Sequence, residues 1–598
     1  MNSFFRELKQ RKVYRVALGY AVVAWLVVQI SATVMPAYHA PDWILPIFIT
    51  VVALGFPVAL VLAWAFELKG GVIEKTPEST GRLAAVNKRR VWLLAAAGLI
   101  ISALTVGGYW IWHPWLNTSA AKSITASTAS EPSTVTTPAV SEKSIAVLPF
   151  ANLSRDPDNA YFATGIQDEI ITRLAKITEL KVISCTSTHR FKSAPDDLPA
   201  IAKELRVANI MEGSVQRYAD QVRVNVQLIK AESDAHLWAD TFDRKLTDIF
   251  AVESEIARTI AETLQAKLTG EEQRQLNRRD TSNPEAYEFY LKGRYYWEKR
   301  TGQNLRKAID QFQQAADKDS DYALAYAGLA DCYLLLEDYL GAPASETYPK
   351  AKAFAERALQ LDNSLAEAHT SLAYAYTNLW QWEQAEEEFK RAVKLSPNYP
   401  TAHHWYSLLL LDLGRIDEAM AEIKSAHELD PLSLIIGTTL TYAYLAEGDA
   451  NSSVAQCKRV IDFDPNFSRA HEYLGLAYLK QERHSEAIGE LQKAVELSRE
   501  RRQLRDLGYG YAISGKRTEA LNLLKELEGK YEKHQAIGQD LAAVYAGLGE
   551  KDQAFAWLEK DFQARSGPLA WIRWIAPFDL LRSDARHADL LRRMGIPR

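Results

Sequence analysis

Two patterns in the chain hold residue types that could do chemistry. Gly510–Arg517 reads GYAISGKR, which departs from a phosphate-binding P-loop at Arg517, where that loop has the Ser or Thr that binds Mg²⁺. His369, His403 and His471 share one position of a repeating pattern, and imidazole nitrogens are common zinc ligands. Whether either pattern does chemistry depends on the elements that position it.

The expected elements do not suit these chemistries. A P-loop follows a strand, but Gly510–Arg517 begins inside an expected helix, and Gly515 is expected at the turn after it. Histidines at one position of stacked helical repeats lie roughly 10 Å apart, whereas zinc binds its nitrogens at about 2.1 Å. We therefore interpret the three histidines as packing residues between helices, and neither pattern predicts a bound nucleotide or metal.

A third candidate is Gly165, followed by Gln167, Asp168 and Glu169, which could form an ion or phosphate site at a helix start. Acidic side chains in the first turn of a helix are stabilised by the helix dipole, and they would repel a phosphate. We interpret these residues as a helix first turn and not as a ligand site.

The cysteines, the motifs and the net charge of the chain do not predict an enzyme. Cys185, Cys332 and Cys457 have the spacing of neither a disulfide framework nor a zinc site, so buried thiols are expected. The chain contains no His-Glu-x-x-His, Gly-x-Ser-x-Gly or Gly-x-Gly-x-x-Gly. The net charge of −5 argues against a nucleic-acid partner, which requires a basic surface. We expect no catalytic residue, no metal and no cofactor.

Three uncharged apolar stretches lie near the start of the chain, at Val16–Met35, Ile44–Phe66 and Val91–Trp112. Each has 20 to 23 residues, the length of a transmembrane helix. Five Lys or Arg residues precede the first stretch, none lies between the first two, and six lie between the last two. Because positive loops stay cytoplasmic, this pattern predicts a bacterial inner-membrane protein with a cytoplasmic N-terminus and residues after 112 in the periplasm.

Two alternatives to this topology remain open. The first stretch could be a cleaved signal peptide, although its apolar run is long for one and a second stretch follows it closely. If the third stretch only lies in the interface, the rest of the chain faces the cytoplasm. Residues 113–142 are rich in Ser and Thr and predict a flexible linker after the membrane unit, residues 1–112.

Residues 143–277 alternate between strand and helix patterns, which predicts an α/β domain with an antiparallel hairpin. The expected strands are Ser144–Phe150, Leu180–Thr188, Ile210–Tyr218, Val222–Ile229 and His236–Phe242, and the expected helices are Tyr161–Ile177, Leu198–Leu205 and Ile249–Leu268.

Three blocks of this region are SIAVLPFANLSRDPDNAYFATGIQDEIITRL, NIMEGSVQRYADQVRVNVQLI and HLWADTFDRKLTDIFAVESEIA. Their order resembles the TolB amino-terminal-like domain of bacterial envelope proteins. The resemblance implies an envelope location and an interaction or assembly role, and it brings no agreed catalytic residues. The N-terminal segment also resembles the membrane unit that often precedes this domain. Relatives with these parts sometimes carry an adenylate-cyclase or winged-helix domain, and we expect neither here.

A regular period of about 34 residues runs through the rest of the chain. One unit shows it at His369, Leu372, Ala373, Tyr376, Ala385, Phe389, Ala392 and Pro397, and the next at His403, Tyr406, Ser407, Leu410, Ala419, Ile423, Ala426 and Pro431. This pattern resembles the tetratricopeptide repeat, a helical hairpin that buries its apolar face by stacking on its neighbours. We predict an all-α solenoid of about eight repeats over residues 284–567 and a C-terminal cap over residues 568–598.

The first helices of such repeats line a concave groove, in which aromatic side chains could anchor a peptide or a partner helix. The predicted groove residues are Tyr374, Asn378, His404, Trp405, Tyr442, Tyr473 and Lys480. The leading hypothesis is therefore a membrane-anchored, envelope-facing protein-interaction scaffold. The alternative is a transmembrane signalling or sensory subunit that acts through a cytoplasmic partner, and an enzyme with an unfamiliar site is a third hypothesis.

Overall fold

The computed structural model describes residues 140–596, apart from 156–158, 194, 196 and 341, together with the backbone of a short hairpin near the N-terminus. The chain divides into two compact units, Met1–Thr134 and Val135–Arg598. In the first unit, β1 (Phe66–Lys69) pairs antiparallel with β2 (Val72–Lys75). Apart from Phe66, the predicted membrane segments lie outside the described residues. None of the helices in the described part of the chain combines the length and the apolar composition that a membrane crossing needs.

The second unit begins with the α/β domain, whose sheet has the order β5-β3-β6-β7-β8, with β4 paired to β6. Strands β3 and β5 and strands β3 and β6 are parallel, whereas β6, β7 and β8 form an antiparallel meander. The strands are β3 (Ser144–Val147), β4 (Ala151–Asn152), β5 (Lys181–Val182), β6 (Asn209–Tyr218), β7 (Gln221–Lys230) and β8 (Ala235–Lys245). The helices are α5 (Ala160–Ala175), α6 (Cys185–Thr188), α7 (Leu198–Leu205), α8 (Ile249–Thr263) and α9 (Gly270–Leu276), with the 3-10 turn η3 (Leu246–Asp248).

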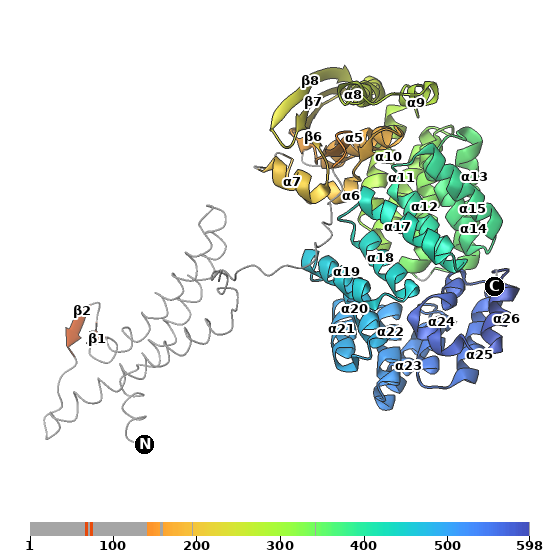
Figure 1. The fold of residues 1–598 in the computed structure, drawn as a ribbon. Helices are drawn as coiled ribbons and strands as arrows, with labels where there is room; N and C mark the ends of the chain where they lie inside the picture. Colours follow the sequence, from red (N-terminus) through yellow and green to blue (C-terminus); the bar gives the residue numbers. More distant parts are fainter. Residues whose placement is uncertain are drawn as a thin grey trace, which may run out of the picture. The chain divides into compact units, whose positions relative to one another are not determined.

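Alternation along β3 gives the sheet two buried faces. Ile145 and Val147 belong to the apolar core shared with α5 and α8, whereas Ala146 and Leu148 belong to a second core that includes Ile201 of α7. Figure 1 shows β6, β7 and β8 together with α5, α7 and α8 in this domain. The predicted α/β domain is therefore present.

Two local predictions in this domain are wrong. The expected strand Leu180–Thr188 is a two-residue strand followed by helix α6, because the Ser184 hydroxyl accepts a hydrogen bond from the Thr186 backbone N–H and starts a helical turn. Residues 165–169 are not a helix first turn either. Helix α5 begins at Ala160, so Asp168 lies in the middle of the helix and is buried.

The repeat array follows as consecutive helical pairs, from α10 with α11 to α24 with α25. Its helices are α10 (Pro284–Glu298), α11 (Gly302–Lys318), α12 (Ala323–Leu340), α13 (Ala344–Leu361), α14 (Ala366–Asn378), α15 (Trp382–Leu395), α16 (Pro400–Asp412), α17 (Ile416–Leu429), α18 (Leu434–Glu447), α19 (Ala450–Phe463), α20 (Ser468–Lys480), α21 (His484–Leu497), α22 (Arg501–Ile513), α23 (Arg517–Glu532), α24 (Gly538–Gly547) and α25 (Lys551–Gln563).

The small residues of the repeat pattern lie where helices touch. A Cβ on Gly293 would stand 2.5 Å from the Phe312 ring, so only glycine allows α10 and α11 to approach this closely. Gly515 has a φ of +77° between α22 and α23, as expected for the residue after a helix. Gly510–Arg517 is therefore the end of one repeat helix and the start of the next, and the P-loop interpretation fails on this geometry.

After α25 the chain leaves the repeat pattern and forms η4 (Gly567–Arg573), η5 (Ala576–Leu581) and α26 (Ala585–Arg593). We call Gly567–Leu581 the return segment, because it runs back against helices of earlier repeats. Figure 1 shows the C-terminus near α14 and α15, and the indole N–H of Trp382 donates a hydrogen bond to the carbonyl oxygen of Met594 at 2.8 Å. The end of the chain thus contacts a much earlier repeat.

The α/β domain packs on the first repeat helix through buried polar contacts. The Tyr287 hydroxyl donates to the Glu253 carboxylate at 2.6 Å, and the Arg173 guanidinium lies 3.6 Å from Glu253 and 3.2 Å from Asp280. Burial raises the pKa of Glu253 to about 7 despite the neighbouring Arg173. These contacts join α5, α8 and α10, so the α/β domain and the repeats share one core.

Candidate functional site

A cavity of about 420 Å³ lies on the side of the repeats that faces the α/β domain and the return segment. Side chains from α5 and α6 bound it on one side, and side chains from the first helices α10, α12, α14, α16, α18, α20 and α22 bound it on the other. The volume is that of an ordinary ligand pocket. The walls are mixed and hold both aromatic rings and charged side chains.

Five of the seven predicted groove residues line this cavity: Tyr374, His404, Trp405, Tyr442 and Tyr473. The rings of Tyr374 and Trp405 stack with centroids 4.5 Å apart, and the rings of Tyr442 and Tyr473 meet edge to face at 4.3 Å. His404 Nε2 contacts the Thr439 hydroxyl at 3.0 Å. Burial, followed by the nearby arginine charges, lowers the pKa of His404 to about 3, so its imidazole is neutral.

The other two predicted groove residues, Asn378 and Lys480, contact the return segment. A Cβ on Gly567 would stand 2.5 Å from the Asn378 side-chain oxygen, so the backbone of the segment approaches α14 closely. Lys480 forms an ion pair with Asp579. These two side chains therefore face the chain's own C-terminal part.

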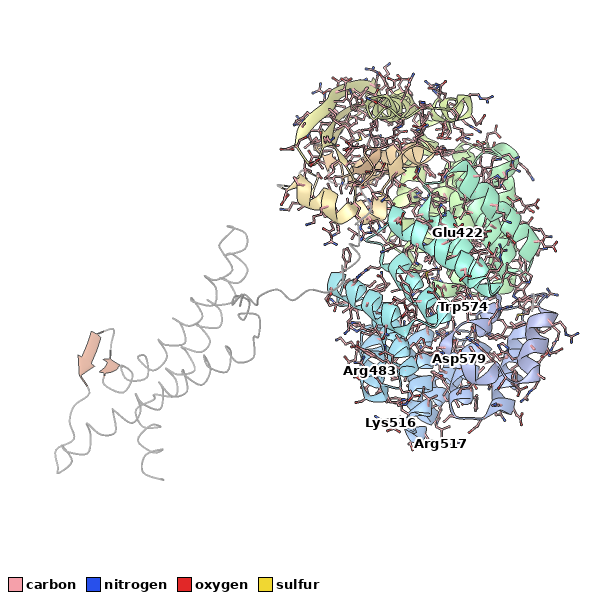
Figure 2. The ribbon with its side chains drawn as sticks, viewed as in Figure 1. Glu422, Arg483, Lys516, Arg517, Trp574 and Asp579 are labelled. Carbon is pink, nitrogen blue, oxygen red and sulfur yellow. The ribbon has the colours of Figure 1, made fainter. Side chains whose placement is uncertain are left out.

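The return segment also supplies part of the cavity wall, through Trp571, Trp574 and Ile575. The Trp574 indole N–H donates to Asp412 Oδ1 at 2.7 Å, and its ring meets Tyr442 edge to face at 5.1 Å. Figure 2 shows Trp574 where the C-terminal part of the chain meets the repeat helices. Sequence reasoning expected residues 568–598 only at the end of the array. The one signal available was the density of aromatic residues in PLAWIRWIAPF, where the repeat period is absent.

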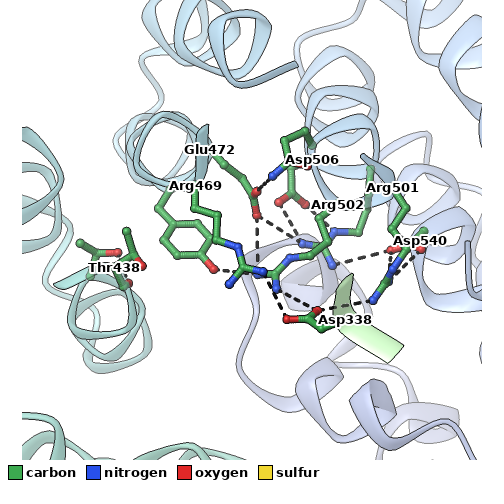
Figure 3. Close-up of polar contacts among 12 residues, drawn as sticks. Asp338, Thr438, Arg469, Glu472, Arg501, Arg502, Asp506 and Asp540 are labelled. Atoms are coloured by element: carbon green, nitrogen blue, oxygen red, sulfur yellow. Dashed lines mark hydrogen bonds and ion pairs between the residues drawn. The ribbon is translucent and has the colours of Figure 1, made fainter. Parts of the chain in front are cut away.

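A network of arginines and acids borders the cavity through Asp338, Arg469 and Arg502. Figure 3 shows its hydrogen bonds and ion pairs. Arg469 of α20 lies 3.2 Å from Asp338 of α12, and Arg501 of α22 lies 3.0 Å from Asp540 of α24. Despite its burial, these arginine charges lower the pKa of Asp338 to about 2. The same network includes Glu472, Arg502, Arg505 and Asp506. It joins helices of repeats that are not neighbours in sequence, and the repeat pattern did not predict it.

The cavity also holds charged side chains near the α/β domain. Both Arg294 Nε and Nη2 donate to Asp168 Oδ2, at 3.1 and 3.0 Å. The Arg300 guanidinium lies 3.7 Å from the centroid of the Trp297 ring, and within the described residues no carboxylate forms an ion pair with it. Arg300 is thus a cationic group of the cavity wall held by an aromatic face.

The repeated histidines occupy packing positions. His403 Nδ1 contacts Glu422 of the next helix at 2.6 Å, and its Nε2 contacts the Pro397 carbonyl oxygen at 2.9 Å. His471 makes the equivalent contacts with Glu490 at 2.7 Å and with the Pro465 carbonyl at 3.0 Å. Each imidazole therefore links the two helices of one repeat and the preceding loop, in agreement with the packing interpretation.

Family models match two parts of the chain. Residues 141–259 match the second domain of HilA/YgeH-like transcriptional regulators, and residues 290–353, 381–434 and 439–501 match tetratricopeptide repeat models. The repeat prediction is thereby confirmed. The TolB amino-terminal-like assignment and the membrane anchoring stay predictions.

A protein of Rhizobium meliloti (strain 1021) named "Putative adenylate cyclase 3" is 35% identical over 246 residues, which are 41% of this chain and 42% of that protein. The chain thus spans about two-fifths of that relative's length. Among solved structures, YrrB, a TPR protein with an unusual peptide-binding site, is 22% identical with a TM-score of 0.24, over 31% of this chain and 92% of that one. TTC0263, a thermophilic TPR protein of Thermus thermophilus, is 20% identical with a TM-score of 0.29, over 32% and 99%.

Proposed function

We propose that this chain is a protein-interaction scaffold that binds a short segment of a partner protein in the cavity of the repeat array. The observation that carries the proposal is the convergence of Tyr374, His404, Trp405, Tyr442 and Tyr473, from different repeats, on one cavity. Tetratricopeptide repeats bind protein or peptide partners, and buried aromatic side chains are the usual anchors of such interfaces.

The size of the cavity limits what the partner inserts. A volume of about 420 Å³ is too small for a whole helix, because a helix with side chains is roughly 10 Å or more across. The return segment occupies the part of the groove beside Asn378 and Lys480. We therefore propose that the partner inserts a chain end or a few residues of an extended segment.

One cation of the cavity wall, Arg300, favours a carboxylate on the inserted segment. Arg300 lies in the wall without a carboxylate partner among the described residues, and it stacks on Trp297. Arg469 points to the same region, since both arginines lower the pKa of His404. A carboxylate of the peptide would bind Arg300. An apolar side chain of the peptide would pack on the rings of Tyr374 and Trp405, which line the same cavity.

Binding of labelled peptides by the full-length protein in detergent tests this proposal. We expect peptides with an acidic end and an apolar neighbour to bind, and Arg300→Gln to weaken them by about tenfold, the loss of roughly 1.4 kcal/mol that one charge-assisted hydrogen bond supplies. The matched control is Arg517→Gln, because Arg517 is exposed, pairs with Glu550 at 2.6 Å and lies at the outer edge in Figure 2. Equal binding by acidic and neutral peptides, or equal losses in both variants, would refute the proposal.

We also propose that the apolar segments 16–35, 44–66 and 91–112 hold the scaffold in a bacterial inner membrane, with residues after 112 in the periplasm. The support is the apolar length of the segments and the distribution of Lys and Arg around them. Reporter fusions after residues 80 and 130 test it. Opposite sides for the two reporters are expected, and the same side would move the repeats to the cytoplasm.

A signalling role is the second candidate function, because the Rhizobium relative and the family matched by residues 141–259 carry regulatory names. In this role a ligand binds in the cavity, and the membrane segments transmit the resulting conformational change to a cytoplasmic partner. A cytoplasmic protein that crosslinks to the segment before Val16 only when an acidic peptide is bound would favour it. That the chain is not an enzyme stays a prediction, and an assay for adenylate cyclase activity tests it, with none expected.

A further inference from the structure

Four metal-binding side chains lie together where the α/β domain meets the first repeat. Asp168 comes from α5, Cys185 and His189 come from α6 and the residue that follows it, and Glu298 ends α10. All four line the cavity. Carboxylate, thiolate and imidazole are the ligands that zinc takes in proteins, so their meeting from three separate elements suggests a site.

The spacing of the donor atoms is close to that of a coordination sphere. A carboxylate oxygen of Asp168, the Cys185 Sγ and a carboxylate oxygen of Glu298 all lie within 4.8 Å of one another. The Sγ is 2.9 Å from His189 Nε2, and His189 Nδ1 is 3.7 Å from Glu298. Ligand atoms around a tetrahedral zinc ion are separated by about 3.5 Å, as follows from bond lengths of about 2.1–2.3 Å. A shift of roughly 1 Å brings the three donors to that distance.

The helical geometry explains the pairing of Cys185 with His189. They are four residues apart, and both adopt helical backbone angles, so their side chains project from one face of the turn. Ser184 starts this turn and fixes its position beside α5. The structure agrees with the sequence interpretation of Cys185 as a buried thiol. The sequence did not show that Asp168 and Glu298 lie beside it, because they are distant along the chain.

The cluster brings two carboxyl groups and a thiol together, with arginines beside them. Arg294 donates twice to a single oxygen of Asp168, which leaves the other oxygen available, and Glu298 has no cationic partner among the described residues except the weakly placed His189. Of the other charged side chains that face the cluster, Arg300 contributes a cation and Asp430 a further carboxyl.

We propose that Asp168, Cys185 and Glu298 bind a divalent transition-metal ion of the zinc type. The thiol favours zinc over calcium or magnesium, which prefer oxygen ligands. Binding replaces the thiol proton, which leaves to solvent through the cavity. Arg294 then orients the Asp168 carboxylate from the side away from the ion. The ion would tie α5 and α6 to α10 at one end of the cavity.

Cobalt titration of the full-length protein tests the site, after the purified protein is dialysed against a chelator. We expect one Co²⁺ per chain, with the charge-transfer absorption of a cobalt–thiolate bond, and displacement by Zn²⁺. Cys185→Ser should abolish this absorption. Cys457→Ser is the matched control, because Cys457 is a buried, unbridged thiol in α19, away from the cluster.

Glu298→Gln keeps the shape of the side chain and should weaken Co²⁺ binding by about tenfold or more, which keeps the test informative if Cys185→Ser does not fold. No cobalt–thiolate absorption in the wild type, its persistence in Cys185→Ser, or its loss in the Cys457→Ser control would each overturn the proposal. The test does not depend on the peptide proposal, because Arg300 is not among the donors.

Discussion

Asp412 provides a test of how the return segment is held against the repeats. It is the last residue of α16, is 2% exposed, and accepts a hydrogen bond from the Trp574 indole N–H at 2.7 Å. Burial raises the pKa of this carboxyl from 3.8 to about 7, although the Trp574 hydrogen bond and the Arg573 charge lower it. The substitution Asp412→Asn keeps an oxygen acceptor for Trp574 in a side chain of the same shape and removes the titration.

The sign of the effect follows from proton binding. Between the unfolded pKa of 3.8 and the folded pKa of about 7, the folded chain holds a proton on Asp412 that the unfolded chain has lost. The free energy of unfolding of the wild type therefore falls as the pH rises through this window, by about 1.4 kcal/mol per pH unit, and the contribution is constant above it. The variant does not lose this stability, so its free energy of unfolding relative to the wild type should rise by about 2 kcal/mol between pH 5 and pH 7.

Urea unfolding of both proteins, followed by tryptophan fluorescence at several pH values, measures the difference, and the other titrating groups cancel in it. Asp552→Asn is the control, because Asp552 is 93% exposed and forms a surface ion pair with Arg586 at 2.8 Å. That control should change the free energy of unfolding by less than about 1 kcal/mol at every pH. A stability difference for Asp412→Asn that is independent of pH would refute the reasoning.

Three further substitutions test the packing of the array by urea unfolding. Trp574→Ala removes a buried indole and should lower the free energy of unfolding by about 3–5 kcal/mol, and a loss below about 1 kcal/mol would mean that the return segment is not held. Asp338→Asn removes the negative charge that pairs with Arg469, Arg501 and Arg502, and should lower the free energy of unfolding by about 3–5 kcal/mol. An unchanged urea midpoint would contradict this. Gly293→Ala places a Cβ against Phe312 and should cost about 1–3 kcal/mol. Its control, Gly489→Ala on the exposed face of α21, should gain about 0.5–1 kcal/mol, so equal effects would contradict the packing argument.

The repeat part of the fold could be predicted because its information is local. The turn role of Gly515 follows from its place in the period. In the α/β domain, the predicted helix Leu198–Leu205 has the same bounds as α7, because its apolar pattern is local too. Each repeat has apolar and small residues at the same positions, so the sequence shows the pattern of a helical pair several times. Five of the seven predicted groove residues line the cavity, because a residue's place in the repeat fixes the side of the helix on which it lies. That they bind a partner stays a prediction.

The rest depends on contacts between distant residues, which one sequence does not encode as a pattern. Helix α6 has only four residues. The apolar residues before it, Val182 and Ile183, are typical of a strand, so the pattern predicts that the strand continues. Asp168 was interpreted from its neighbours in sequence, whereas its role comes from Arg294, 126 residues away. The contact of Trp574 with Asp412 spans 162 residues, and no periodicity marks either partner.

These distant contacts change how the repeat array should behave. In a simple array each repeat touches only its neighbours, so local unfolding and bending cost little. Here Asp338 of α12 reaches Arg469 of α20 and Arg501 of α22, and the return segment joins α14, α16 and α24. Buried ion pairs contribute little net stability, because desolvation offsets their attraction, but an unpaired member is costly. The network therefore opposes any change of groove width that separates the pairs, and it holds the aromatic rings at the spacing that the proposed partner would meet.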